Sequence, residues 1–178
     1  INALELGSPL TLITESVFAR CLSSLKEERV SASKYLKGPQ ETFSGDASLL
    51  IECIRKALYA SKIISYAQGF ALIKEATKEY SWNINLSQLA HIWQGGCIIR
   101  SEFLTKIVDA YQRNPQLENL LMDEFFSQAI ESAQNSWREL IKVAIDLGIP
   151  VPCFSAALAY FDGYRTARSP ANLLQAQR

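Results

Sequence analysis

The 178-residue sequence predicts an all-α domain. Apolar residues recur at three- and four-residue steps through most of the chain, which is the period of an amphipathic helix. No segment alternates apolar and polar residues over the length of a strand, so we expect essentially no sheet. The only long irregular stretch is Lys37–Gly45, where Gly38, Pro39 and Gly45 act as helix breakers.

The predicted helices follow one another with short connections. In chain order they occupy Thr11–Leu36, Asp46–Tyr80, Asn85–Trp93, Cys97–Arg113, Leu117–Leu147, a segment from about Cys153, and a segment that begins at Ser169-Pro170. Small and apolar residues surround most of the circumference of Ala57–Phe70. A helix with this composition packs against neighbours on several sides, so we expect Asp46–Tyr80 to be central and buried.

The longest regular pattern is an apolar stripe along Leu117–Leu147. Its members are Leu117, Leu121, Phe125, Ala129, Ala133, Trp137, Leu140, Ile141 and Ala144. Asn114-Pro115 is typical of a helix start, and Gly148 with Pro150 of a helix end. One continuous helix would exceed about 40 Å, at 1.5 Å per residue. That length is more than a compact domain of this size needs, so an interruption within the span is the alternative.

One short internal repeat is present. Ala3–Leu10 (ALELGSPL) matches Ala144–Val151 (AIDLGIPV) without a gap, with four identical and three conservative positions. Each copy reads as a helix that ends in Leu-Gly, turns through Gly and Pro, and enters another helix. The likeness indicates a duplicated helical unit. Convergence on a common helix-stop sequence is the alternative.

Composition excludes several classes of partner. Lys+Arg and Asp+Glu both number 18, which gives no reason to expect nucleic acid or an anionic membrane as partner. The apolar runs are short and broken by charges, so no membrane span is expected. Because the chain opens at Ile1 without Met, we expect a fragment of a longer protein or a processed product.

The four cysteines are widely separated. Cys21, Cys53, Cys97 and Cys153 lie more than thirty positions apart, without the clustering of a zinc site or a disulfide framework. We therefore expect buried, reduced thiols, no metal, and a reducing, cytoplasmic compartment.

Few residues could carry chemistry. The single histidine, His91, is expected to be a partly buried helix residue rather than a base or a ligand. Arg20 lies among apolar neighbours, so its guanidinium either extends to the surface or is kept for an anion. Arg100 is expected in a buried ion pair, and Arg178 at a frayed helix end.

Six segments together are similar to one enzyme family. They are Phe18–Arg29 (FARCLSSLKEER), Ala57–Phe70 (ALYASKIISYAQGF), Gly95–Ser101 (GGCIIRS), Gly148–Phe154 (GIPVPCF), Phe161–Arg165 (FDGYR) and Asn172–Arg178 (NLLQAQR). The chain resembles the C-terminal helical domain of the 6-phosphogluconate dehydrogenases over essentially its whole length, in order. The resemblance implies a domain built from a duplicated helical unit, and a homodimer with an interface made largely by this domain.

The resemblance also implies an activity and two site residues. The family oxidises 6-phosphogluconate with NADP and decarboxylates the product to ribulose 5-phosphate, in the pentose phosphate pathway and gluconate utilization. The position of Arg20 binds the substrate phosphate, and that of Arg178 supplies a second phosphate ligand to the neighbouring subunit. Two planar, forked cations suit one dianion. The resemblance assigns no role to Arg100.

The family's remaining machinery has no counterpart in this sequence. The Rossmann-type nucleotide-binding domain, the catalytic lysine and the catalytic glutamate precede this region in the family, and a tail with a substrate-binding histidine follows it. We therefore expect residues 1–178 to form a substrate-binding and dimerisation domain that is inactive alone. Two alternatives are a non-catalytic helical dimerisation or scaffold domain and, disfavoured by the two arginines, a hydroxyacid dehydrogenase with another substrate.

Overall fold

The computed structural model of the chain describes residues 2–99 and 101–177, and all of the regular secondary structure in these ranges is helical. The helices are α1 (Asn2–Glu5), α2 (Thr11–Ser24), α3 (Lys26–Ala32), α4 (Ala47–Glu79), α5 (Leu86–Gly96), α6 (Glu102–Arg113), the 3-10 turn η1 (Leu120–Met122), α7 (Glu124–Asp146), α8 (Pro152–Tyr164) and α9 (Ala171–Gln175). The predicted all-α class is confirmed. Within the described ranges, no helix combines the length and the apolar content needed to cross a bilayer.

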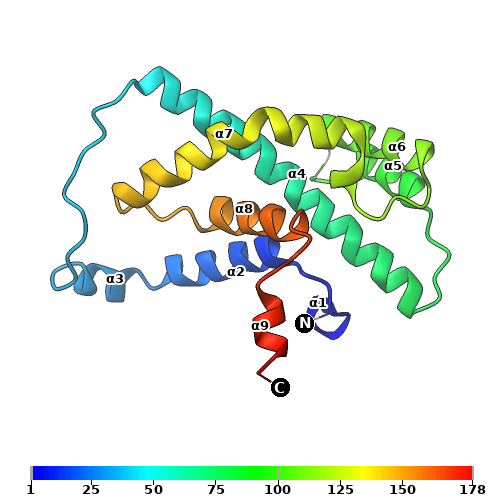
Figure 1. Ribbon diagram of the computed structural model, residues 1–178, viewed down its shortest axis with the longest axis horizontal. Coiled ribbons are helices and arrows are strands. Elements are labelled where there is room, and N and C mark those ends of the chain that lie inside the picture. Colours follow the sequence, from blue (N-terminus) through cyan, green and yellow to red (C-terminus); the bar gives the residue numbers. More distant parts are fainter. Residues whose placement is uncertain (1, 100, 178) are drawn as a thin grey trace.

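The long helix α4 is the axis of the fold. It runs diagonally through the molecule in Figure 1, with α7 along one side, α2 and α8 below it, and α5 and α6 beside its C-terminal half. It is central, as predicted, and one face of its middle is buried: Ala57, Ala60 and Ala67 let the neighbouring helices approach closely while Ile63 and Ile64 fill the space between them. The opposite face is not buried, since Leu58 is 52% exposed. Asp46 caps its start by accepting hydrogen bonds from the next turn.

The predicted helix over Leu117–Leu147 is interrupted. Helix α7 begins only at Glu124, after a loop and the η1 turn. The reason is local: Asn119 Oδ1 accepts the Leu121 N–H at 3.0 Å, and Asp123 Oδ1 accepts the Phe125 N–H at 3.1 Å. These side chains offer the backbone an alternative to continuous helical bonding, and both are almost fully buried.

The buried face of α7 is shifted relative to the predicted stripe. It is made by Phe126, Ile130, Ala133, Trp137, Leu140, Ile141 and Ala144. Phe125 and Ala129, which the pattern placed inside, are only half-buried. Phe125 and Ala129 precede Ala133 by eight and four residues, and each four-residue step turns about 40° beyond a full turn, so the stripe drifts off the buried face of α7.

Two other predicted helices are shorter than expected. The helix predicted over Thr11–Leu36 is divided at Leu25 into α2 and α3. At this break the Arg29 guanidinium donates to the Ser23 carbonyl at 3.0 Å, so this carbonyl keeps a hydrogen bond that a continuous helix would have given it. The helix predicted to begin at Cys97 begins at Glu102 instead, with the Ser101 hydroxyl as its cap. Helix α5 in turn extends to Gly96.

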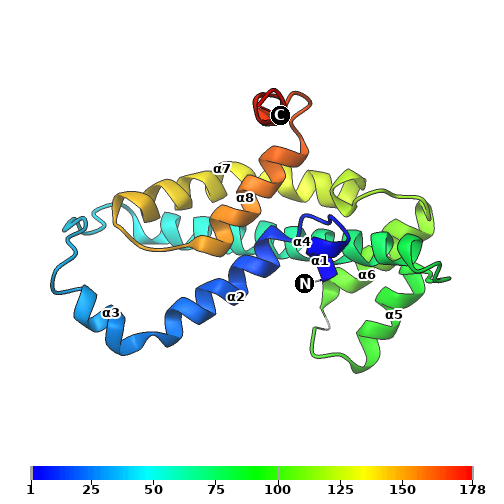
Figure 2. The ribbon, with the colours of Figure 1, turned by 90° about the horizontal axis from the view of Figure 1, so that it is seen from below.

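The two copies of the internal repeat adopt the same turn. At the first, the Ser8 N–H bonds the Ala3 carbonyl at 2.8 Å; at the second, the Ile149 N–H bonds the Ala144 carbonyl at 2.8 Å. Gly7 and Gly148 have φ values of 62° and 65°, the left-handed conformation that ends a helix in a Schellman motif. The helices that follow, α2 and α8, pack against each other. Figure 2 shows them side by side below α7.

A buried glutamine joins α4 to the start of α2. Gln68 is 1% exposed, and its Oε1 accepts the Leu12 backbone N–H at 3.1 Å while its Nε2 donates to the Thr11 hydroxyl at 2.9 Å. The residue in the N-cap position of α2 is Leu10, which cannot provide a side-chain cap. Gln68 therefore satisfies an N–H group that the first turn of α2 leaves unpaired.

An ion cluster joins α7 to the end of α8. The Arg138 guanidinium contacts Asp162 through two parallel hydrogen bonds of 2.9 and 2.5 Å, and Arg165 Nε donates to the same carboxylate at 3.1 Å. These hydrogen bonds, that of Arg138 first, hold the pKa of the Asp162 carboxyl below its ordinary value. The two-point contact between the Arg138 guanidinium and the Asp162 carboxylate holds the C-terminal end of α8 against the middle of α7.

Replacing Gln68 with Met should destabilise the fold, because the Leu12 N–H would stay buried without an acceptor. The expected loss in the free energy of unfolding is about 1–3 kcal/mol, measured by urea denaturation. The matched control is Gln88→Met, since Gln88 is exposed on α5; its effect should stay within about 0.5 kcal/mol. Equal effects of the two substitutions would contradict the role given to Gln68.

Replacing Asp162 with Asn should destabilise the protein in a pH-dependent way. Because the folded-state pKa of Asp162 is depressed, its contribution is present above the ordinary carboxyl pKa of about 4 and is lost as the pH falls through the folded value. We expect a loss of about 1 kcal/mol at pH 7, since the pair is one-third exposed, and a smaller loss near pH 3. Urea denaturation at both pH values measures this.

The control for the Asp162 experiment is Glu131→Gln. Glu131 is exposed on α7 and belongs to none of the ion pairs found among the described residues. Its stability difference from the unsubstituted protein should be small and similar at both pH values. An Asp162→Asn difference that is the same at pH 7 and pH 3 would refute the ion-pair account.

Candidate functional site

Arg20 lies on the outer face of α2. The inner face of this helix packs into the core through Leu12, which is 7% exposed, and through half-buried Ile13. Arg20 follows Leu12 by eight residues, about 12 Å along the helix axis, and its side chain is exposed. The start of α2 is fixed by Gln68, so the position of Arg20 is set by the junction of α2 and α4.

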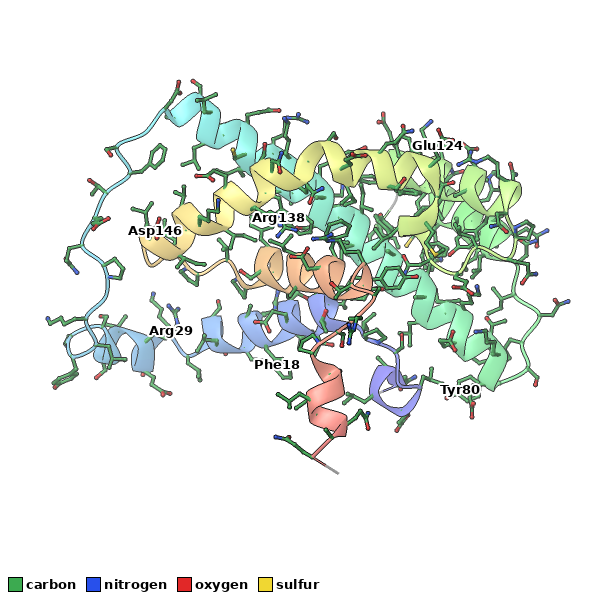
Figure 3. The ribbon with its side chains drawn as sticks, viewed as in Figure 1. Phe18, Arg29, Tyr80, Glu124, Arg138 and Asp146 are labelled. Atoms are coloured by element: carbon green, nitrogen blue, oxygen red, sulfur yellow. The ribbon has the colours of Figure 1, made fainter. Side chains whose placement is uncertain are left out.

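The Arg20 guanidinium makes no ion pair or hydrogen bond with the described residues. One turn before it on the same helix lies Val17, which is 55% exposed, whereas Phe18 and Leu22, which are 62% and 61% exposed, lie on the opposite side of α2. Figure 3 shows Phe18 pointing away from the body of the molecule. The Arg20 guanidinium therefore reaches solvent without a partner among the described residues, and it can donate two parallel hydrogen bonds to an anion.

Of the two predicted phosphate ligands, the structure describes only Arg20. Arg178 lies outside the described residues, and so does Arg100, for which a buried ion pair was predicted. The last described helix, α9, extends away from the body in both Figure 1 and Figure 2. Its Leu173 and Leu174 are 71% and 66% exposed. The predicted start at Ser169-Pro170 is confirmed, because the Ser169 hydroxyl accepts the Ala171 N–H at 3.1 Å.

The histidine is more exposed than predicted. His91 lies on the solvent face of α5, where its Nδ1 is 3.1 Å from Gln94 Oε1. Its neighbours in the sequence are apolar, but they lie on the other sides of the helix. Among the described residues, no group of three or more His, Cys, Asp or Glu side chains could hold a metal ion.

The prediction that the cysteines are buried is wrong. All four are free, but Cys21 is exposed and Cys53, Cys97 and Cys153 are half-buried. Cys21 shares the outer face of α2 with Arg20, so its apolar neighbours do not enclose it. Partial burial, and secondarily the negative charge of Glu15, raises the pKa of the Cys153 thiol.

Two positioning residues were not singled out from the sequence. Gln68 is a polar residue in the apolar run Ala57–Phe70, and a buried polar side chain of this kind needs partners. That pattern could have marked it as a junction, although it does not identify the helix that it contacts. Asp162 carries no such local signal, because Arg138 is 24 positions away in the sequence.

The chain matches a known family over its full length. The family model described as 6-phosphogluconate dehydrogenase, C-terminal domain, covers residues 1–178. A curated protein of Ovis aries named 6-phosphogluconate dehydrogenase, decarboxylating, is 61% identical over 179 residues, which are 100% of this chain and 37% of that protein. The protein of the same name from Schizosaccharomyces pombe is 58% identical over 99% of this chain and 36% of its own length.

A solved structure agrees with the fold. Plasmodium falciparum 6-phosphogluconate dehydrogenase, described in its apo form and in complexes with its cofactor NADP+ and its substrate 6-phosphogluconate, superposes with a TM-score of 0.93. The two are 39% identical, and the match covers 99% of this chain and 38% of that one. The chain thus spans just over a third of the length of these relatives. It belongs to the 6-phosphogluconate dehydrogenase family and corresponds to the C-terminal domain of that family.

Proposed function

We propose that this chain is the helical, substrate-binding part of an enzyme that oxidatively decarboxylates 6-phosphogluconate to ribulose 5-phosphate with NADP. The observation that carries the proposal is the family match over residues 1–178, at 61% identity to a relative of that name. The pentose phosphate pathway, gluconate utilization and a cytoplasmic location belong to the same proposal. The proposed domain boundaries are those of the whole chain.

Within this proposal, Arg20 binds the substrate phosphate. A phosphate monoester is a dianion near neutral pH, and a guanidinium can donate two parallel hydrogen bonds to it. The exposure of Arg20, and the absence of any carboxylate partner among the described residues, support this role. Arg178 is proposed as the second ligand, supplied to the neighbouring subunit of a homodimer. Held at two points, the sugar acid would be oriented as well as bound.

The described residues do not fit a dinucleotide cofactor. A Rossmann-type site needs a strand that leads through a glycine-rich turn into a helix, and residues 2–99 and 101–177 contain no strand. No part of the hydride transfer is therefore assigned to this chain. We propose that NADP is bound mainly by other parts of the protein, and that residues 1–178 alone do not turn over substrate.

The alternative function is a non-catalytic helical dimerisation or scaffold domain. It is favoured by one observation, the apolar surface of α2 and α3 made by Val17, Phe18, Leu22, Leu25 and Val30. These side chains are 47–62% exposed. An apolar patch on this scale usually contacts another protein surface. A scaffold domain would form the same homodimer as the proposed enzyme, but it would not turn over 6-phosphogluconate.

Substitution of Arg20 tests the proposed site. In the full protein that contains this chain, Arg20→Ala should lower kcat/KM for 6-phosphogluconate by about 10²-fold or more, because a charge-assisted bidentate contact is lost. Arg20→Lys should lose less, since it retains the charge without the fork. The measurement is the rate of NADP reduction at saturating cofactor.

Lys26→Ala is the matched control for Arg20→Ala. Lys26 is an exposed cation on the adjacent helix α3, and it makes no hydrogen bond or ion pair with the described residues. Its kcat/KM should stay within about twofold of the unsubstituted value. If the protein turns over and Arg20→Ala is unaffected, the site assignment fails. A correctly folded protein without turnover would favour the scaffold function.

Self-association through α2 and α3 is a separate expectation. We expect the chain to form dimers, and Leu22→Asp to weaken them because a carboxylate would be buried in an apolar interface. Light scattering behind a sizing column measures the molar mass. Ile92→Asp is the control, since Ile92 is 68% exposed on α5, away from α2 and α3. A monomer at high concentration would contradict the expectation.

A further inference from the structure

We propose that a pocket between α4, α5 and α6 binds a phosphate group, either as inorganic phosphate or as a small phosphate monoester. The pocket has a volume of about 340 Å³. It lies beside the C-terminal end of α4, near Tyr80, on the opposite side of Figure 3 from Arg29. Its lining includes Lys74, Lys78, Asn85, Leu86, Ser87 and Tyr111. The proposal does not depend on the function proposed above.

The first observation is a buried tyrosine hydroxyl without a partner. Tyr111 is 3% exposed, and its ring stacks on Phe70 at 5.7 Å between centroids, yet its hydroxyl makes no hydrogen bond with the described residues. The one described side-chain atom that is both fully enclosed and unpaired is Ser61 Oγ, so the Tyr111 hydroxyl keeps some accessible surface. Tyr111 lines the pocket, and burial raises the pKa of this hydroxyl. It therefore remains a donor at any physiological pH.

The second observation is the N-terminus of α5, which borders the same pocket. Asn85 caps the helix by accepting the Gln88 N–H at 3.0 Å. The backbone N–H groups of Leu86 and Ser87 precede the first intrahelical hydrogen bond and have no acceptor within the described chain. With the helix dipole, such groups favour an anion. Leu86 and Ser87 both line the pocket, and the Ser87 hydroxyl donates to the Val108 carbonyl at 3.3 Å, which holds this turn against α6.

The third observation is the charge of the lining. Lys74 Nζ donates to the Leu117 carbonyl at 3.0 Å and to the Gln116 carbonyl at 3.4 Å, which leaves one ammonium donor unused. One turn further along α4, Lys78 pairs with Glu75 at 2.9 Å. Among the described residues, no Asp or Glu side chain lines the pocket. The lining therefore carries two cations, with one carboxylate nearby to offset them in part.

Together these groups select a compact anion. A hydroxyl, two backbone N–H groups and an ammonium group all offer donors, and a phosphate dianion accepts from several donors at once. A neutral ligand would not balance the charge of Lys74 or the helix dipole. The volume lies at the lower end of the range for small-molecule sites, which suits a phosphate or a small ester.

The test is calorimetric titration of inorganic phosphate into the full protein that contains this chain. The background is Arg20→Ala, so that the proposed substrate site contributes little heat. Adding Tyr111→Phe should raise the Kd for phosphate about tenfold or more, because it removes one hydrogen bond to a charged group and leaves the stack on Phe70 intact. Adding Lys78→Gln should raise the Kd about two- to threefold.

The matched control is Lys142→Gln in the same background. Lys142 on α7 is as exposed as Lys78 and also pairs with a glutamate three residues away, Glu139. Its Kd for phosphate should be unchanged. Equal phosphate affinity in Tyr111→Phe and in the background overturns the proposal, as does an equal effect of Lys142→Gln and Lys78→Gln.

A second measurement locates the anion. Crystals of the full protein soaked in selenate should show an anomalous peak within hydrogen-bonding distance of the Tyr111 hydroxyl and the Ser87 N–H. A pocket without such a peak overturns the proposal. Titration of glycerol 3-phosphate distinguishes the two forms of the ligand: tighter binding than inorganic phosphate assigns an ester, and equal or weaker binding assigns the free ion.

Discussion

The fold depends on the hydrogen bonds that Gln68 makes inside the core. A 33-residue helix such as α4 could be packed by its neighbours at several angles, because its buried face consists largely of small and apolar side chains. Gln68 removes this freedom, since its amide has one arrangement that satisfies both Leu12 and Thr11. The start of α2 is thereby fixed, and with it the surface that carries Arg20.

The helices that could be predicted from the sequence are those whose ends are marked by their own residues. The central helix was predicted at Asp46–Tyr80 and observed at Ala47–Glu79, because Asp46 is an ordinary cap. The helix over Leu117–Leu147 was not, because Asn119 and Asp123 bond the backbone from buried positions. Local propensity cannot distinguish an asparagine on the solvent face of a helix from one that ends it.

The sequence identified Arg20 as a candidate site residue, but it did not predict which groups surround the side chain. Periodicity alone gave two possible roles for Arg20, an extension of the side chain to solvent or the binding of an anion. The guanidinium is exposed in both cases, so its exposure does not distinguish them. The resemblance to a family supplied the role that is now proposed for it. The donors around Tyr111 gave no comparable signal, because they come from three helices and a loop that are separated in the sequence. Tertiary contacts bring them together, among them the packing of Phe70 against Tyr111 and the hydrogen bond from the Ser87 hydroxyl to the Val108 carbonyl.

The two matching glycine turns differ in how much change each can accept. Gly7 has open space where a side chain would begin, so its left-handed conformation is the only restriction, and asparagine tolerates that conformation. A Cβ at Gly148 would lie 2.9 Å from Pro39 Cδ, so the irregular segment between α3 and α4 adds a steric restriction. The turn at Gly148 therefore excludes a side chain because of its contact with Pro39, and the turn at Gly7 has no such contact. During evolution, Gly7 could be replaced without a change elsewhere in the domain. Replacement of Gly148 would require a compensating change in the Lys37–Gly45 loop.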